Sequence, residues 1–199
     1  MMTIDEHTFN EKLLIGKLVI DAGARGFKFS EALADLGCPV LAMDVENFDR
    51  KNDGRIWFIH GALWDKTEPI EVHRFGNGTA NFVKGLNGIP YNGPDRPCIT
   101  ETVQAYSLEH VVYMTTSKII DLLKLDVEAS EYRILLNIQA NLLPRQITAE
   151  THRHVNKELH DEQWPIVIRH LAQWYEVSRH SIYPDYPDMD TLYIRRDLL

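Results

Sequence analysis

Short apolar runs and helical stripes alternate along most of this chain. The first run, 18–20, is too short for a helix and stops at Gly23 and Gly26, so it predicts a buried strand followed by a tight turn. Apolar residues then recur at helical spacing from Phe29 to Leu36, and Gly37 is expected to end that helix. Further strands are predicted at 40–43, 56–59, 70–75, 102–106, 119–127, 146–150, 174–183 and 191–194.

The remaining helices follow from the same pattern. Ser107 can cap a short helix, a stripe from Tyr132 to Leu143 predicts another, and the last runs over 164–171 with Pro165 in its first turn. Strands that alternate with helices predict an α/β fold, in which helices cover both faces of a mostly parallel sheet. Right-handed crossovers then bring the ligand-facing turns to one edge of that sheet, at the carboxyl ends of the strands.

One long segment breaks the alternation. Residues 74–97 are rich in glycine, proline and asparagine, a composition that argues against regular structure. We predict a single domain over 1–199, in which 1–16 is an N-terminal segment and 75–97 is a mobile loop or a lid.

Composition and charge narrow the class of protein. The 199 residues are 44% hydrophobic, enough for one domain with a proper core, and the formal net charge of -8 disfavours nucleic acid as a partner. No apolar run is long enough to span a membrane, and acidic residues stand near the start, where a signal peptide would be basic. Two cysteines, Cys38 and Cys98, are too few for a disulfide framework. We expect a soluble cytoplasmic protein, with its oligomeric state left open.

The turn after the first strand is a candidate ligand site. Gly23 and Gly26 would let the backbone approach a ligand, although such glycines also serve simply to pack a helix on a strand. Asp44, at the end of the second strand, is placed to accept hydrogen bonds from a ribose. The dinucleotide fingerprint GxGxxG is absent, since Arg25 and Lys28 stand at the matching positions.

Two clusters of ionisable residues follow later strands. Lys124, Asp126 and Glu128 alternate through the apolar strand at 119–127, which indicates a functional site, an internal ion pair of Lys124, or helix capping. Glu150, His152 and His154 share a face if the next strand continues, where they could hold a metal, supply a general base, or form a solvated loop.

The order of these motifs resembles a known family. VIDAGARGFKFSEAL, LAMDVE, GALWDKTEPIEVHRF, SLEHVV, IDLLKLDVEASEYRIL and ITAETH together are similar to the FkbM-type methyltransferases, which use S-adenosylmethionine. The resemblance covers about two thirds of the chain, from Leu18 to His152, and KLDVEASEYRIL is its most specific part. It implies the class I methyltransferase fold, a Rossmann-like three-layer sandwich with a seven-stranded sheet whose last strand is antiparallel.

The resemblance also assigns residues. It implies that Asp44 holds the ribose, that Asp126 and Glu128 line the floor between cofactor and acceptor, and that Glu150 and His152 face the acceptor. The methionine part of the cofactor would lie against Asp21, Gly23, Ala24 and Gly26, and adenine against Ala62, Leu63 and Trp64. The family differs at three positions, having asparagine at Arg25 and glycine at Phe27 and Ala129.

These implications predict an O-methyltransferase that acts on a hydroxyl of a small molecule or sugar. His152 is the expected general base, Glu150 the next choice, Asp126 a third catalytic residue, and no metal ligand is assigned. Two alternatives stay open. One is a non-catalytic protein that binds a nucleoside ligand on the same fold, and the other is a metal-dependent enzyme built on Asp126, Glu150, His152 and His154.

Overall fold

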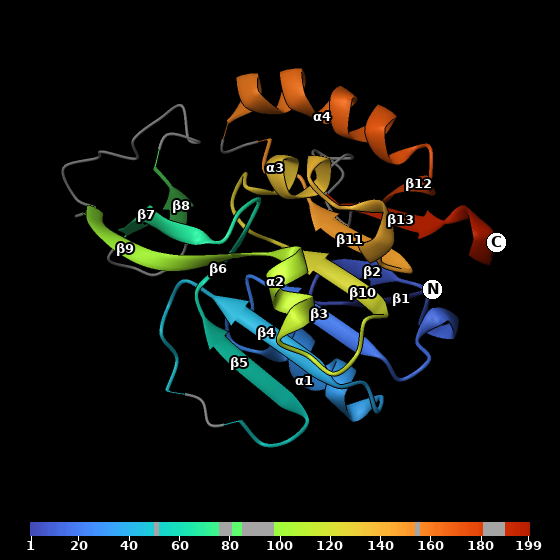
Figure 1. The fold of residues 1–199 in the computed structure, drawn as a ribbon. Helices are drawn as coiled ribbons and strands as arrows, with labels where there is room; N and C mark the ends of the chain where they lie inside the picture. The colour runs from blue at the N-terminus through green and yellow to red at the C-terminus, as the bar shows by residue number, and fades with distance from the viewer. Residues whose placement is uncertain (50–51, 76–80, 85–97, 154–155, 181–189) are drawn as a thin grey trace.

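A seven-stranded sheet forms the centre of the computed structural model, which describes residues 1–49, 52–75, 81–84, 98–153, 156–180 and 190–199 (Figure 1). The strand order is β12-β13-β11-β10-β3-β4-β5. Neighbours from β11 to β5 pair in parallel, whereas β13 pairs antiparallel with both β11 and β12, so the sheet is mixed. The strands are β3 (Leu18–Ala22), β4 (Val40–Asp44), β5 (Ile56–His60), β10 (Ile120–Leu125), β11 (Gln146–Glu150), β12 (Tyr175–His180) and β13 (Asp190–Arg195).

Two smaller sheets accompany it. A four-stranded sheet has the order β6-β9-β7-β8, in which β7 and β9 form a long antiparallel pair. An N-terminal hairpin joins β1 to β2 through Asp5 and Glu6, which both have positive φ, as a two-residue hairpin turn requires. These strands are β1 (Met2–Ile4), β2 (His7–Phe9), β6 (Ala62–Trp64), β7 (Glu68–Phe75), β8 (Asn81–Val83) and β9 (Cys98–Ser107).

Helices are few in the described residues. The α-helices are α1 (Lys28–Asp35), α2 (Leu108–Tyr113), α3 (Glu131–Leu136) and α4 (Lys157–Leu171), and short 3-10 turns lie at Glu11–Leu13, Ala140–Leu142 and Arg196–Leu198. Ser107 caps α2 as predicted, because its side chain accepts a hydrogen bond from the backbone N–H of His110. None of the described helices combines the length and the apolar content that crossing a bilayer requires.

The hydrophobic core lies on both faces of the main sheet. On one face, Phe29 and Leu33 of α1 pack with Val19 and Leu122, and Phe9 of the hairpin joins the same cluster. On the other face, apolar residues of α2, α3 and α4 pack against β3, β10 and β11. The sheet is therefore buried on both sides, which explains why β3, β4 and β10 are buried at every position.

The predicted fold class is wrong. The described chain is strand-rich and mixed, with only four α-helices, of which α2 and α3 have six residues each, and it is not a helix-rich Rossmann-like three-layer sandwich. The prediction placed all strands in one sheet, but 70–75 and 102–106 pair with each other in a separate sheet. The pattern of β9 explains the difference: Val103 and Ala105 are buried while Thr102 and Gln104 are exposed, the alternation of an antiparallel strand with one solvated face.

Several elements differ from the prediction. Pro165 lies in the middle of α4 and not in its first turn, because Asn156 caps the helix and the buried stripe extends back to His160. Part of the segment expected to be irregular is strand β8, while 76–80 and 85–97 lie outside the described residues. The strand predicted over 119–127 ends at Leu125, and the hairpin and β6 were not predicted.

Candidate functional site

The candidate site lies at one edge of the main sheet. β3 ends at Ala22, β4 at Asp44, β10 at Leu125 and β11 at Glu150, and these four strands are parallel. Their carboxyl ends, and the turns that follow, therefore meet at the same edge, where ligands of parallel sheets bind. β6 reaches this edge as well, because the N–H of Gly61 donates to the carbonyl of Asp44 over 2.8 Å.

The turn after β3 depends on Gly23. Its φ is +83°, and a Cβ at this position would lie 1.9 Å from the carbonyl oxygen of Asp126. Only glycine can hold the turn this close to the end of β10. The turn is fixed on its other side by two hydrogen bonds, from the N–H groups of Gly23 and Ala24 to the carbonyl of Met43.

The three residues at which the sequence differs from the FkbM pattern are Arg25, Phe27 and Ala129. Arg25 is exposed. Phe27 has a left-handed backbone conformation, and its buried ring packs edge-on against Phe48 and Phe58, with ring centroids 5.5 and 5.3 Å away. Ala129 is buried with a φ of +74°, a conformation usually left to glycine. Phe27 thus fills an aromatic cluster of its own.

Asp44 is a buried carboxylate at the end of β4. Its Oδ1 accepts a hydrogen bond from the N–H of Glu46 over 2.8 Å. Burial raises the pKa of Asp44 to about 6, and the carboxylates of Glu46 and Asp21 add to the effect, although Glu46 N–H and Lys124 oppose it. Keeping a charged acid here costs stability, which is typical of functional carboxyl groups.

Lys124 forms the buried ion pair that the sequence left as one alternative. Its Nζ lies 3.2 Å from Oδ1 of Asp21 and 3.3 Å from Oδ2 of Asp126, and it donates to the carbonyl of Gly23 over 2.7 Å. Burial alone would lower the pKa of Lys124, but the two carboxylates raise it above its usual value. Ser30 donates a further hydrogen bond to Asp21. Lys124 therefore ties the β3 turn to the end of β10.

His152 is surrounded by carboxylates just after β11. Its Nδ1 lies 2.9 Å from Oε1 of Glu131, and its Nε2 lies 3.4 Å from both Oδ1 of Asp126 and Oε2 of Glu128. Burial would lower the pKa of His152, but the carboxylates of Glu131, Asp126 and Glu150 raise it well above its usual value. The surrounding carboxylates thus favour the protonated form of the ring, and the general-base role expected from the sequence stays a prediction.

Glu131 is one functional residue that sequence reasoning missed. It is fully buried at the first position of α3, and its Oε1 also accepts a hydrogen bond from the N–H of Val127. It therefore fixes both the ring of His152 and the chain that leaves β10. The available signal was a second acid three residues after Glu128 in KLDVEASE.

The remaining acids of the site carry raised pKa values. Burial raises the pKa of Glu150 to about 8, of Glu128 to about 7 and of Asp190 to about 7, and in each case nearby carboxylates add to the effect. Positive charge comes from His152 and Lys124, which are already paired, and from the exposed Arg25, which acts on Glu128. The site therefore has an excess of carboxyl groups and favours a cationic ligand.

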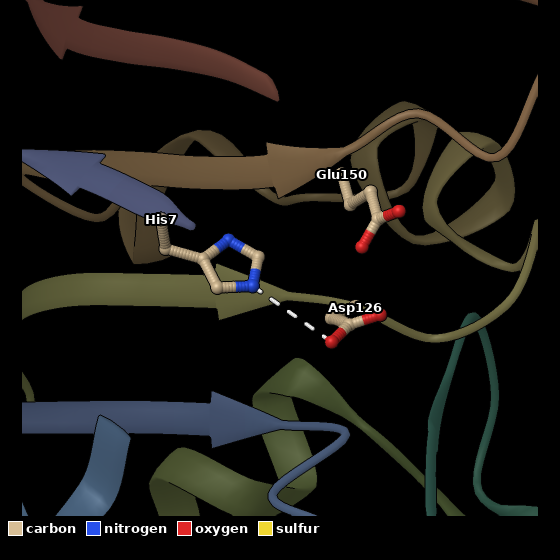
Figure 2. A group of neighbouring side chains, drawn as sticks. All are labelled: His7, Asp126 and Glu150. Carbon is tan, nitrogen blue, oxygen red and sulfur yellow. Dashed lines mark ion pairs between the residues drawn. The ribbon is translucent and has the colours of Figure 1, made fainter. Parts of the chain in front are cut away.

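His7 is a second residue that the sequence did not single out. It lies on β2, only 2% exposed, and its ring faces the carboxylates of Asp126 and Glu150 (Figure 2). Its Nε2 is 3.8 Å from Oδ2 of Asp126. Burial lowers the pKa of His7, which keeps the ring neutral at neutral pH. No sequence signal marks it, because the hairpin is far from β10 and β11 along the chain.

The other predicted site residues lie on β6, after the β3 turn, or outside the described residues. Ala62, Leu63 and Trp64 form β6 and are buried, with the guanidinium of Arg133 4.7 Å from the centre of the Trp64 ring. Gly26, which follows the β3 turn, has a φ of +70° and open space where a Cβ would lie. His154 lies outside the described residues.

Comparisons with known proteins do not classify the chain: no family model matches it, and neither does any curated protein.

Proposed function

We propose that this chain is an S-adenosylmethionine-dependent methyltransferase that acts on a hydroxyl group of a small molecule or sugar. The observation that carries the proposal is the convergence of separate motifs at one sheet edge. Gly23, Asp44, Asp126 and Glu150 come from four different strand ends, and these are positions at which the FkbM resemblance implies contact with cofactor or acceptor.

The residues present fit this cofactor. Asp44 offers carboxylate oxygens for the two ribose hydroxyls, and its burial limits competition from water. The excess of carboxyl groups near Asp126 favours a ligand with a positively charged sulfur. Neither Arg25, which is exposed, nor Phe27, whose ring packs with Phe48, blocks the turn.

When bound, S-adenosylmethionine supplies an electrophilic methyl group. The protein's contribution is to align the acceptor oxygen with that carbon and to exclude water. Glu150 can take the proton of the acceptor hydroxyl in its ionised form, which its raised pKa of about 8 makes strongly basic and populates at mildly alkaline pH, whereas His152 is held among carboxylates that favour its protonated form. His152, held by Glu131, keeps Asp126 and Glu128 in position.

Calorimetric titration with S-adenosylmethionine and S-adenosylhomocysteine tests the proposal. We expect both compounds to bind the wild-type protein, and Asp44→Asn to weaken binding by about tenfold or more, because an amide replaces the carboxylate that accepts from the ribose. Asp35→Asn is the matched control, since Asp35 is an exposed acid on α1.

Two results would count against the proposal. Absence of binding to the wild-type protein would remove the cofactor, and equal binding by Asp44→Asn would move the site elsewhere. If the cofactor binds but is never consumed with any hydroxyl acceptor, the chain is a binding protein for a nucleoside ligand and not an enzyme.

A further inference from the structure

Three side chains from three separate elements converge beside the proposed acceptor side. His7 comes from β2, Asp126 from the turn after β10, and Glu150 from the end of β11 (Figure 2). One ligand atom from each lies within 4.8 Å of the other two. We propose that His7, Asp126 and Glu150 bind a divalent metal ion.

The buried imidazole of His7 argues for a metal more strongly than the carboxylates do. Its Nε2 is the nitrogen that faces Asp126, and their 3.8 Å separation is longer than a hydrogen bond; Nδ1, on the other side of the ring, has no hydrogen-bond partner either. A buried polar ring without a partner is costly and calls for a ligand. Phe29 packs edge-on against the ring at 5.7 Å and helps to hold it toward the acids.

The contacts of the two nearby histidines differ. His152 also lies within reach of Asp126 and Glu128, but its Nδ1 is 2.9 Å from Oε1 of Glu131 and its Nε2 is 3.4 Å from each of the two acids. His152 is therefore already paired, whereas the shortest contact of the His7 ring with an acid is 3.8 Å. Of the two rings, His7 is the one with room for an ion between its nitrogen and the carboxylates.

The charge of the surroundings favours a cation at this point. Lys124 forms an ion pair with Asp21 and donates a hydrogen bond to the carbonyl of Gly23, and His152 forms an ion pair with Glu131. Asp126 touches both of these cations, but Glu150 lies only within 3.8 Å of His152. A divalent ion between His7, Asp126 and Glu150 would supply positive charge beside both carboxylates.

The ligand set indicates which metals fit. One imidazole nitrogen and two carboxylates suit Mn²⁺, Fe²⁺ or Zn²⁺ better than a soft ion, because the set contains no sulfur. This inference goes beyond the proposed methyl transfer, since metal binding at these residues requires no methyl donor. It also differs from the metal set suggested by the sequence, in which His152 and His154 took the place of His7.

A titration of the full chain with Mn²⁺ alone tests the site, with the free ion measured by electron paramagnetic resonance at each step. We expect the wild-type protein to bind a single Mn²⁺ and to gain thermal stability with added Mn²⁺. Glu150→Gln and His7→Phe should each weaken Mn²⁺ binding by about tenfold or more, as loss of a ligand does. Glu158→Gln and His110→Phe, at exposed positions, are the matched controls and should bind as the wild type does.

Thermal melting without metal shows whether each variant folds. If His7→Phe does not fold, the result for Glu150→Gln decides the outcome. Failure of the wild type to bind Mn²⁺ overturns the proposal, and so does binding that both site variants retain. The cofactor titration separates this result from the proposed function. If the site variants lose Mn²⁺ binding and the wild type does not bind S-adenosylmethionine, the metal site stands and the methyltransferase proposal fails. If the wild type binds S-adenosylmethionine but not Mn²⁺, the methyltransferase proposal stands and the metal site fails.

Discussion

At the scale of single residues, the buried carboxylate of Asp44 lowers the stability of the folded protein at neutral pH. Its pKa is about 6 in the folded protein, mainly through burial, against 3.8 for an ordinary aspartate. The folded state therefore binds the proton more tightly than the unfolded state does. The free energy of unfolding consequently falls as the pH rises from about 4 to about 6, by up to about 3 kcal/mol, and the loss persists above that range.

We expect Asp44→Asn to be more stable than the wild type at pH 7 and to lose most of this advantage at pH 4. The amide is neutral at both values and can still accept from the N–H of Glu46. Urea unfolding of both proteins at the two pH values measures the difference, and Asp35→Asn should show no comparable pH effect. An Asp44→Asn protein that is less stable at pH 7 would contradict this account.

The buried pair of Lys124 and Asp21 leads to a second prediction at this scale. Lys124→Met should lower the free energy of unfolding by about 3–5 kcal/mol, because it leaves the charge of Asp21 buried without its partner. The double variant Asp21→Asn with Lys124→Met should recover part of that loss. Urea unfolding of both single variants and the double variant measures the coupling.

An exposed ion pair provides the control. Lys28 lies 2.7 Å from Asp5, but both side chains are largely in solvent. Lys28→Met should therefore change the stability little, since exposed pairs contribute little. Equal losses from Lys124→Met and Lys28→Met would mean that burial does not govern the pair of Lys124.

At the scale of elements, helix α4 contains a proline, which does not fit the hydrogen-bonding pattern of a helix interior. Pro165 lies in the interior of the helix, where it cannot donate the hydrogen bond to the carbonyl of residue 161. We expect Pro165→Ala to raise the free energy of unfolding by about 1–3 kcal/mol, because alanine restores that donor and has the highest helix propensity. Urea unfolding measures the gain.

Pro39 is the matched control for this prediction. It lies in the turn before β4, is exposed, and offers only its carbonyl, which accepts from Val19. Pro39→Ala should lower the stability slightly, because it raises the conformational entropy of the unfolded chain and adds no hydrogen bond to the folded one. A gain from Pro39→Ala as large as that from Pro165→Ala would show that the helix is not the cause.

Elements were predictable where burial gives a strong local pattern. The runs around Leu18, Val40 and Gln146 became β3, β4 and β11, and the stripe from Phe29 became α1. The hairpin was not predictable, because its three-residue strands have no periodicity of their own and are stabilised by contacts with β11 and β13. The same reason explains β6, whose partner β9 follows some forty residues later.

At the scale of the whole molecule, local sequence signals could not decide which strands share a sheet. β7 and β9 were predicted as strands, yet their mutual pairing separates them from the main sheet and overturns the predicted fold class. The site was predictable where its residues follow parallel strands, as Asp44, Asp126 and Glu150 do. His7 was not, because only the tertiary packing of the hairpin brings it to that edge.

The position of His7 also affects when the site can form. His7 is synthesised well before Glu150, which lies on β11, and the antiparallel partner of β11, strand β13, follows later still in the chain. Domains fold as units once their strands are available, so a nascent chain without β11 cannot assemble these ligands. During synthesis, His7 therefore leaves the ribosome before its proposed co-ligands, and the metal site forms only after β10, β11 and β13 have been made.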